Sequence, residues 1–217
     1  MKKVGHYDTS ELIEAQFQPG SRGCVLRNKL GIKSKREMDK FEKQEQFSAI
    51  EELIGNYEGN HSFTADDICM IHKLWLGKIY EWAGRYRQVN VSKGDFLFAA
   101  AAQVPKLMTE LERGPLRKYT PCRFEYLEKI IEALAVVHTE LVLIHPFREG
   151  NGRVARMLSI LMGLQAGLPP LDFRNIVGRK KKEYILAVHA GMSGNYGPME
   201  KVFGSVIRRT LRIRGHR

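Results

Sequence analysis

The sequence predicts a mainly α-helical fold that carries one small β-hairpin. Apolar residues recur at helical spacing along most of the 217 residues, and residues 124–144 are apolar on nearly every side of a helix. Strand-forming residues flank a Gly94-Asp95 turn, which is typical of a hairpin. A chain of this length with 43% hydrophobic residues can bury one sizeable core.

Residues 1 to about 35 are irregular and rich in Gly, Lys and Arg, so we expect a surface arm there. A helix is predicted from Lys35 to Ile54, with apolar anchors at Met38, Phe41, Phe47, Ile50 and Ile54. After a loop at 55–60, Thr64 has the features of an N-cap, with acidic residues following it. The next helix is expected to end at Gly84, and its apolar residues are Ile68, Ile71, Leu74, Trp75 and Ile79.

The hairpin is predicted over Arg85–Phe98, and a further helix over Ala101–Glu112. The strongest helix, Phe124–Ile144, should be central and buried, and it should end at His145 because the residue before a proline avoids the α region. A second apolar helix is expected from about Arg153 to Ala166, and basic helical segments complete the chain.

The composition limits the partners and the compartment. A formal net charge of +11 favours acidic partners such as nucleic acid, an anionic membrane, an acidic protein or a polyphosphate, although a solvated basic surface fits equally well. Cys24, Cys69 and Cys122 are far apart and odd in number, which argues against a disulfide framework or a zinc site. Without a signal peptide or a membrane-spanning apolar run, we expect a cytoplasmic protein unless a specialised secretion system exports it.

The most informative stretch is residues 145–156, HPFREGNGRVAR. His145 ends one buried helix, and the glycines Gly150 and Gly152 precede the next, where backbone N–H groups can form an anion nest beside a helix N-terminus. Arg153 and Arg156 lie three residues apart near the first turn of that helix, and the arginine fork suits phosphate.

Two further residues complete a chemical set. Glu149 is a hard oxygen ligand suited to Mg²⁺, and His145 can accept a proton at neutral pH. A base, a metal ligand, a phosphate cradle and two cationic groups indicate phosphoryl or nucleotidyl transfer. The bland alternative, a turn with His145 as an ordinary helix-end residue, does not account for so many features within twelve residues.

These residues resemble the Fic (Fic/Doc, Fido) family, whose signature HPFx[D/E]GNGRxxR is matched at every fixed position. Residues 79–87 are similar to the family segment that leads into a flap hairpin, residues 91–98 to the flap, and residues 184–203 to the closing helices. The resemblance implies a helical bundle with a flap over the site. It divides the chain into an N-terminal arm and helix (1–59), a Fic catalytic core (60–205) and a basic C-terminal tail (206–217).

The resemblance also implies a role for each motif residue. His145 would deprotonate a target hydroxyl, which then attacks the α-phosphate of ATP. Structural and ligand-binding roles follow for Pro146 and Phe147 (loop shape), Glu149 (Mg²⁺), Gly150, Asn151 and Gly152 (the α- and β-phosphates), Arg153 (the β-phosphate) and Arg156 (the γ-phosphate). The flap around Lys93 and Gly94 would border the nucleotide and pair with an extended target segment.

The implied activity is protein adenylyltransfer, in which AMP passes from Mg-ATP to a Ser, Thr or Tyr hydroxyl of a target protein. Gly152 favours AMP over phosphate transfer, while transfer of UMP, phosphate or phosphocholine stays open. A basic nucleic-acid-binding regulator is the competing hypothesis from another class, although we do not expect nucleic acid or a membrane as the partner. An inert nucleotide sensor is a third reading, but it would not need a base such as His145.

Many Fic enzymes are inhibited by a helix bearing [S/T]xxxE[G/N]. Glu58 is followed by Gly59, but Ile54 stands where Ser or Thr should be, and Glu14 of Ser10-x-x-x-Glu14 lacks the following Gly or Asn. We therefore hypothesise a toxin inhibited in trans by a separate small antitoxin, or a constitutively active enzyme.

Several other residues are given structural interpretations. His138 is interpreted as a hydrogen-bonded core histidine, and His72 and His189 as lone helical histidines without metal spacing. Trp75 and Trp82 are expected in the core, whereas the basic runs 179–182 and 208–217 are interpreted as solvated faces.

Overall fold

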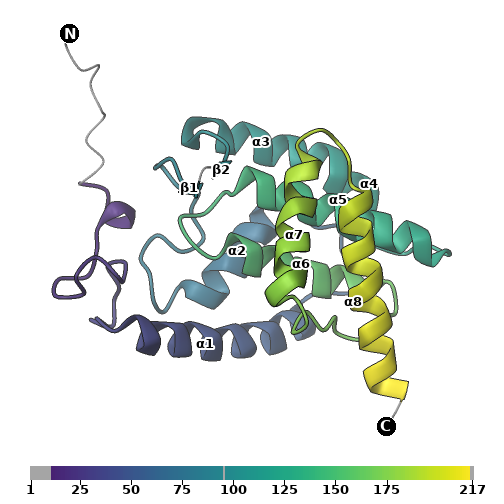
Figure 1. The fold of residues 1–217 in the computed structure, drawn as a ribbon, viewed down its shortest axis with the longest axis horizontal. Coiled ribbons are helices and arrows are strands. Elements are labelled where there is room, and N and C mark those ends of the chain that lie inside the picture. Colours follow the sequence, from purple (N-terminus) through teal and green to yellow (C-terminus); the bar gives the residue numbers. More distant parts are fainter. Residues whose placement is uncertain (1–10, 95, 216–217) are drawn as a thin grey trace.

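Helix α5 (Leu127–Ile144) lies at the centre of the fold and is buried along most of its length, as its apolar sequence predicts. The computed structural model describes residues 11–94 and 96–215, with side chains through residue 213. Among the helices that pack directly on α5 are α6 (Asn151–Gln165), α7 (Gly178–Gly191) and α8 (Gly197–Gly215), and Figure 1 shows α7 and α8 crossing in front of it. The predicted mainly α fold with a small hairpin is confirmed.

Helix α1 (Lys35–Asn56) runs along one edge of the molecule and packs on α2 and α6 (Figure 1). Ser34 caps it by accepting a hydrogen bond from the Glu37 N–H. Two predicted anchors are wrong, because Phe47 is 62% exposed and Ile54 is 41% exposed. At about 100° per residue both lie roughly opposite Met38. The face that packs inward carries Met38, Glu42, Ala49 and Leu53 instead.

Helix α2 (Ala65–Leu76) begins at a capping box in which Thr64 and Asp67 bond to each other's backbone N–H groups, so the predicted N-cap is confirmed. The helix ends at Leu76, not at Gly84, because Gly77 takes the C-cap position. Gly84 instead closes the following turn at φ 82°, where a Cβ would lie 2.7 Å from the Lys73 Cβ. Trp75 and Trp82 are both buried, as expected.

The hairpin is much shorter than predicted. Strands β1 (Ser92–Lys93) and β2 (Phe96–Leu97) pair antiparallel, with Ser92 opposite Leu97, and Gly94 adopts φ 59° in the turn, while Asp95 lies outside the described residues. Residues nearer the start of the predicted hairpin bond elsewhere, since the Arg87 N–H donates to the Pro146 carbonyl and not to a facing strand.

The segment after the hairpin is helical for longer than predicted. A 3₁₀ turn η2 (Ala101–Gln103) leads into α3 (Val104–Leu111), and a π-helical turn η3 (Glu112–Leu116) and α4 (Arg117–Tyr119) continue it. Val104, Met108 and Leu111 are buried, and this segment packs against α5.

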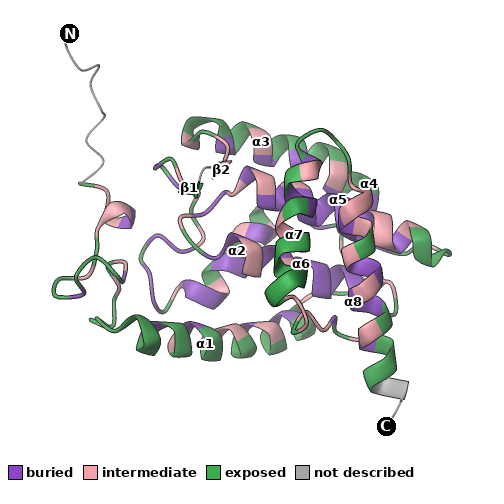
Figure 2. Cartoon of the chain, in the orientation of Figure 1, coloured by how far each residue is buried: buried purple, intermediate pink, exposed green. Residues whose placement is uncertain are grey.

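Figure 2 shows that burial concentrates where α2, α5 and α6 meet, with the arm and the outer faces of α1 and α8 exposed. The described part of the arm, residues 11–34, is irregular as predicted, and it holds a 3₁₀ turn η1 (Ile13–Ala15) and a bridge between Phe17 and Leu26. Residues 206–215, expected as a tail, continue α8 with Val206 and Ile207 in the core. Within residues 11–94 and 96–215, no helix is long and apolar enough to cross a membrane.

Candidate active site

His145 stands at the C-terminal end of α5 in the left-handed conformation, with φ 53° and ψ 58°. Its Nδ1 lies 3.0 Å from the Val142 carbonyl oxygen. A carbonyl can only accept, so Nδ1 carries the proton and Nε2 keeps a free lone pair. Burial lowers the pKa of His145 to about 4, which leaves the imidazole neutral at pH 7. The side chain is therefore a base whose accepting nitrogen is defined by the backbone.

Arg87 holds this unusual backbone in place. The side chain is 2% exposed, and its Nε donates to the His145 carbonyl at 2.7 Å. Its other nitrogens donate to the carbonyls of Val89 and Ala99, on either side of the hairpin. Sequence reasoning assigned Arg87 no role of its own, because a buried arginine that bonds only to carbonyls leaves no charge pattern in the sequence.

His72 contacts the motif loop at Phe147 and Glu149. Its ring stacks on Phe147 with centroids 3.9 Å apart, and its Nδ1 accepts from the Gly84 N–H at 2.7 Å. The Nε2–H therefore donates to the Glu149 carbonyl at 3.1 Å. Burial lowers the pKa of His72 to about 3, so the ring is neutral. This histidine was interpreted as a lone residue, since its partners lie far away in the sequence and no spacing signals them.

The side chain of Asn151 is bonded to the backbone of the motif loop. Its Oδ1 accepts from the Phe147 N–H and its Nδ2 donates to the Phe147 carbonyl, both at 2.8 Å. Helix α6 begins at Asn151, two residues before the predicted start at Arg153. The N–H groups of Asn151 and Gly152 thus belong to the first turn, where helical N–H groups lack intrahelical partners. The expected phosphate cradle is the helix N-terminus itself.

The two glycines of the motif differ in what they require. Gly150 adopts φ 86°, and a Cβ on it would lie 2.6 Å from Cζ3 of Trp75. At Gly152 a Cβ would come no closer than 3.7 Å to a described atom, the Arg156 Nη2. Gly150 is therefore demanded by the fold, whereas Gly152 leaves open space at the helix N-terminus.

Arg153 is held between two carboxylates. Its Nη1 pairs with Glu42 Oε2 at 2.7 Å, its Nη2 lies 3.4 Å from Glu149 Oε1, and the guanidinium lies over Trp75 at 4.4 Å. Glu42 comes from α1, is buried, and also accepts from the Tyr80 hydroxyl at 2.9 Å. Sequence reasoning missed Glu42, although a carboxylate among the inward-facing positions of α1 could have signalled it.

Glu149 is suited to a divalent cation that also binds phosphate. Its Oε1 accepts from the Gly150 N–H at 2.9 Å, and its Oε2 has no hydrogen-bond partner among residues 11–94 and 96–213. The side chain is half exposed. Mg²⁺ in nucleotide sites is held by one or two carboxylates together with phosphate oxygens and water, so this residue fits it.

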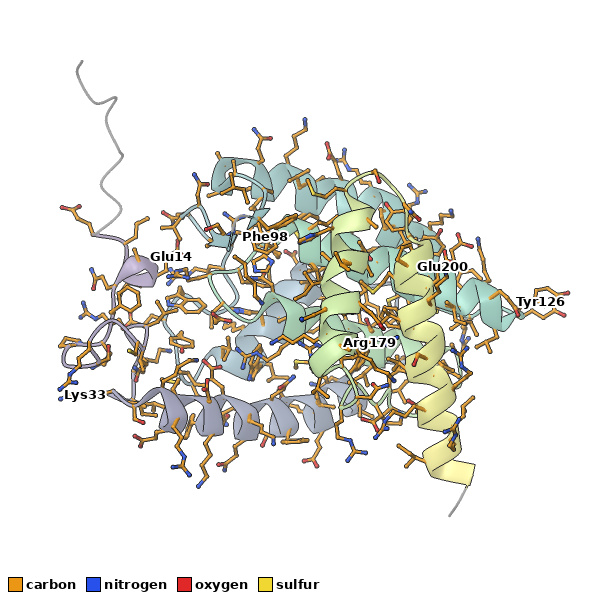
Figure 3. All side chains as sticks on the ribbon, viewed as in Figure 1. Glu14, Lys33, Phe98, Tyr126, Arg179 and Glu200 are labelled. Atoms are coloured by element: carbon orange, nitrogen blue, oxygen red, sulfur yellow. The ribbon has the colours of Figure 1, made fainter. Side chains whose placement is uncertain are left out.

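A cavity of about 620 Å³ opens beside these residues. Lys93 and Phe98 line it from the hairpin, His145 from the end of α5, and Gly152 and Arg156 from α6. Residues 176–189 form the opposite wall with α7. The side chain of Phe98, labelled in Figure 3, covers His145, and Phe96 stacks on His189 at 4.3 Å.

The cavity gathers part of the predicted site. Lys93, His145, Gly152 and Arg156 line it together. The remaining predicted residues do not line it, namely Gly94, Pro146, Phe147, Glu149, Gly150, Asn151 and Arg153. Glu149 lines a separate cavity together with Glu42 and Tyr80.

The two candidate inhibitory glutamates lie apart from Arg156. Glu58 is exposed just beyond α1, and Glu14 is buried where it accepts from the N–H groups of Gln88 and Val89. Arg156 donates from Nε to the Gly152 carbonyl at 2.9 Å, and within the part of the chain described with side chains it forms no ion pair.

Comparison with known proteins shows which family part of the chain resembles. The Fic/DOC family model matches residues 62–162. The chain is 33% identical over 153 residues to the protein adenylyltransferase Fic of Nematostella vectensis, covering 70% of this chain but only 34% of that protein. It is 29% identical over 190 residues to a Salmonella typhimurium protein named probable protein adenylyltransferase Fic, covering 84% of this chain and 88% of that one.

A solved structure shares the fold along most of the chain. It is that of BepC, a VirB-translocated effector of Bartonella tribocorum with bound AMPPNP, with a TM-score of 0.71 and 25% identity. The match covers 90% of this chain and 97% of that one. The family model spans α2, the hairpin and the two helices that carry HPFREGNGRVAR, so residues 62–162 of this chain form a domain of the Fic/DOC family.

Proposed function

We propose that this protein is an adenylyltransferase that moves AMP from Mg-ATP to a Ser, Thr or Tyr hydroxyl of another protein. One observation carries the proposal: His145, whose Nε2 can accept a proton, lines the same cavity as Gly152 and Arg156. A base and an anion-binding helix N-terminus in one cavity suit transfer to a hydroxyl. The names of the Nematostella and Salmonella relatives support the same activity.

In the proposed reaction the target hydroxyl gives its proton to His145 Nε2. Its oxygen then bonds to the α-phosphorus of ATP, the bond from that phosphorus to the bridging oxygen breaks, and pyrophosphate leaves. The neutral state of His145 at pH 7 keeps Nε2 ready to accept.

We assign the phosphates to α6. The N–H groups of Asn151 and Gly152 would cradle the α- and β-phosphates, with Gly150 shaping the turn before them. Arg156 lines the cavity and would bind the γ-phosphate. Arg153 would bind the β-phosphate by sharing its guanidinium between the ligand, Glu42 and Glu149.

Glu149 would hold Mg²⁺ through its free carboxylate oxygen. Bound there, the ion would neutralise phosphate charge that the helix N-terminus alone does not balance. Pro146 and Phe147 would fix the loop that presents both Glu149 and His145, and Phe147 is fully buried against His72.

The hairpin would act as the target clamp. Strands β1 and β2 expose Ser92, Lys93 and Leu97, and an extended segment of the target could add to this edge by main-chain pairing. Gly94 at the turn has open space around it, which would let the segment approach closely.

We further propose that this protein is a toxin, and that a separate small antitoxin protein inhibits it. Glu58 does not bear on Arg156, so Glu58→Ala should leave transfer within about twofold of wild type. Purified protein that stays inactive until Glu58 is replaced would contradict this proposal. Transfer of UMP, phosphate or phosphocholine is the alternative, and γ-labelled ATP in the assay below separates phosphate transfer from AMP transfer.

The test is incubation of the protein with Mg²⁺, a cell lysate and ATP labelled at the α-phosphate, beside the His145→Ala variant. We expect labelled protein with the wild type and a loss of about 10²–10⁴-fold in the variant, the usual worth of a general base. Label that persists in His145→Ala, or label only from γ-labelled ATP, would overturn adenylyl transfer by this base. Equilibrium binding of ATP to the variant is the control for an intact site.

A further inference from the structure

Arg148 lies within the HPFREGNGRVAR motif, and no role follows for it from the proposed function. Its Nε donates to the Glu14 carbonyl of the arm at 3.0 Å. The Glu14 carboxylate in turn accepts from the N–H groups of Gln88 and Val89, at 2.6 and 3.1 Å. Glu14, labelled in Figure 3, therefore joins the motif loop to the segment that leads into the hairpin.

A groove of about 320 Å³ lies between the arm and the first stem of the hairpin. Its lining residues are Ala15, Val89, Asn90, Val91, Ser92 and Arg148. It shares none of them with the cavity that His145 and Arg156 line. Strand β1 borders both spaces, because Ser92 lines the groove and Lys93 lines the cavity. A segment that lies in the groove would therefore run along the strand that also borders the proposed active site.

The register of the hairpin turns the backbone of Ser92 away from β2. The Phe98 N–H donates to the Val91 carbonyl, and Lys93 lies opposite Phe96. Paired residues of antiparallel strands alternate between bonding to the partner strand and facing away from it, so the main-chain groups of Ser92 face away. Within the described residues the sheet has two strands, so this edge of β1 has no partner strand. An extended segment in the groove could pair with it.

The groove is positively charged. Among the described residues that line it, only Arg148 carries a charge. Glu14 holds its Nε, whereas its two Nη groups have no hydrogen-bond or ion-pair partner among the residues described with side chains. The fork of an arginine can donate two parallel hydrogen bonds to a carboxylate. The segment that fits the groove is therefore an extended one that carries an acidic side chain.

We propose that Arg148 is a specificity-determining residue, which selects targets that carry an Asp or Glu close to the modified hydroxyl. The inference rests on the proposed function, since it takes a segment of the target as the occupant of the groove. Arg148 follows His145 by three residues, so their Cα atoms lie no more than about 11 Å apart. An extended segment covers that distance in about three residues. The acidic side chain would therefore lie within about three residues of the hydroxyl.

Peptide binding tests this recognition without catalysis. The probes are fluorescent nine-residue peptides with a central Thr, in which Glu, Gln or Lys is placed in turn at each flanking position. At one or more of the three positions nearest the Thr on either side, the wild type should bind the Glu peptide about fivefold more tightly than the Gln peptide. That factor is the upper end for an ion pair partly exposed to water. Fluorescence anisotropy measures the affinities.

Substitutions at Arg148 separate recognition of charge from a change in the fold. Arg148→Gln should remove the preference for Glu, and Arg148→Glu should reverse it in favour of Lys, which unfolding could not do. Arg85 is the matched control, because it also donates to one backbone carbonyl, that of Glu81, and does not line the groove. Arg85→Glu should keep the wild-type preference.

Equal binding of Glu and Gln peptides by the wild type, or a preference that survives in Arg148→Gln, would overturn this role of Arg148. Wild-type protein that binds none of the peptides would overturn it as well, whatever the labelling assay shows. A preference that Arg148→Glu reverses, in a protein that labels nothing in the lysate, would refute adenylyl transfer and leave the recognition of acidic segments intact.

Discussion

The ring of Phe98 stacks on the ring of His145, with centroids 3.6 Å apart and 21° between the planes. Phe98 comes from the residues just after β2, so the hairpin directly covers the proposed base. Burial is the main cause of the low pKa of His145, and this contact supplies part of that burial.

Removing the covering ring should raise the pKa of the base. In Phe98→Ala we expect the pKa of His145 to rise from about 4 toward the unperturbed value of about 6.5. The reaction needs the unprotonated ring, so the acid limb of kcat/KM should move to higher pH and activity near pH 5.5 should fall. NMR titration of His145 and a pH–rate profile check this. Phe96→Ala, which alters the same hairpin at His189, should leave the His145 titration in place.

Substitution by alanine should affect the two motif glycines differently, because it should destabilise the fold at Gly150 and weaken nucleotide binding at Gly152. Gly150→Ala puts a Cβ against Trp75 at positive φ, so we expect a loss of more than about 2 kcal/mol in the free energy of unfolding. Gly152→Ala should keep stability within about 1 kcal/mol, because the site has space and is helical. Its methyl group should still reduce nucleotide binding. Urea denaturation and AMPPNP titration of both variants measure this, and equal destabilisation would contradict it.

Stability should fall as the pH drops below about 6.5. His72 and His138 have pKa values of about 3 in the folded protein, against about 6.5 for an unfolded chain. The unfolded state binds more protons in this range, so each group removes up to about 1.4 kcal/mol of unfolding free energy per pH unit.

Urea denaturation between pH 7.5 and 5 should show this slope, in a range where the carboxylates stay ionised. His138→Leu should reduce the slope by the share of one group, whatever its effect on stability at pH 7.5. A free energy of unfolding that does not change between pH 7 and 5 would refute the neutral, buried state of both rings.

Glu42 should matter far more than a carboxylate on the outer face of the same helix. Glu42→Ala leaves Arg153 without its buried partner and Tyr80 without an acceptor, so we expect a loss of about 3 kcal/mol in unfolding free energy. Asp39→Ala breaks an exposed pair with Lys35 and should cost no more than about 0.5 kcal/mol. A double-mutant cycle of Glu42 with Arg153, measured by urea denaturation, should give a coupling energy well above zero.

Much of the fold was predictable because it depends on local signals. Residue types and spacing correctly predict the buried helix that ends before His145 and the N-cap at Thr64. The extent of the hairpin was not predictable in this way, since it is decided by a tertiary bond from the Arg87 N–H to the Pro146 carbonyl. The end of α2 was also predicted wrongly, because Gly77 and not Gly84 takes the C-cap position.

The candidate site was likewise predictable only in part. The motif supplied three residues that line the cavity, His145, Gly152 and Arg156, but it did not reveal the side chains that hold the motif in place. His72, Arg87 and Glu42 act through backbone carbonyls or a buried ion pair with residues far away in the sequence. Such contacts leave no periodicity, so only the folded arrangement reveals them.

Arg87 also has a mechanical consequence. One guanidinium holds the carbonyls of Val89 and Ala99 on the two stems of the hairpin and the carbonyl of His145. The stems therefore cannot shift without straining the bond to His145, which couples the hairpin to the proposed base. A segment that distorts the hairpin on binding should therefore also disturb His145, so poor docking should slow the proposed chemical step.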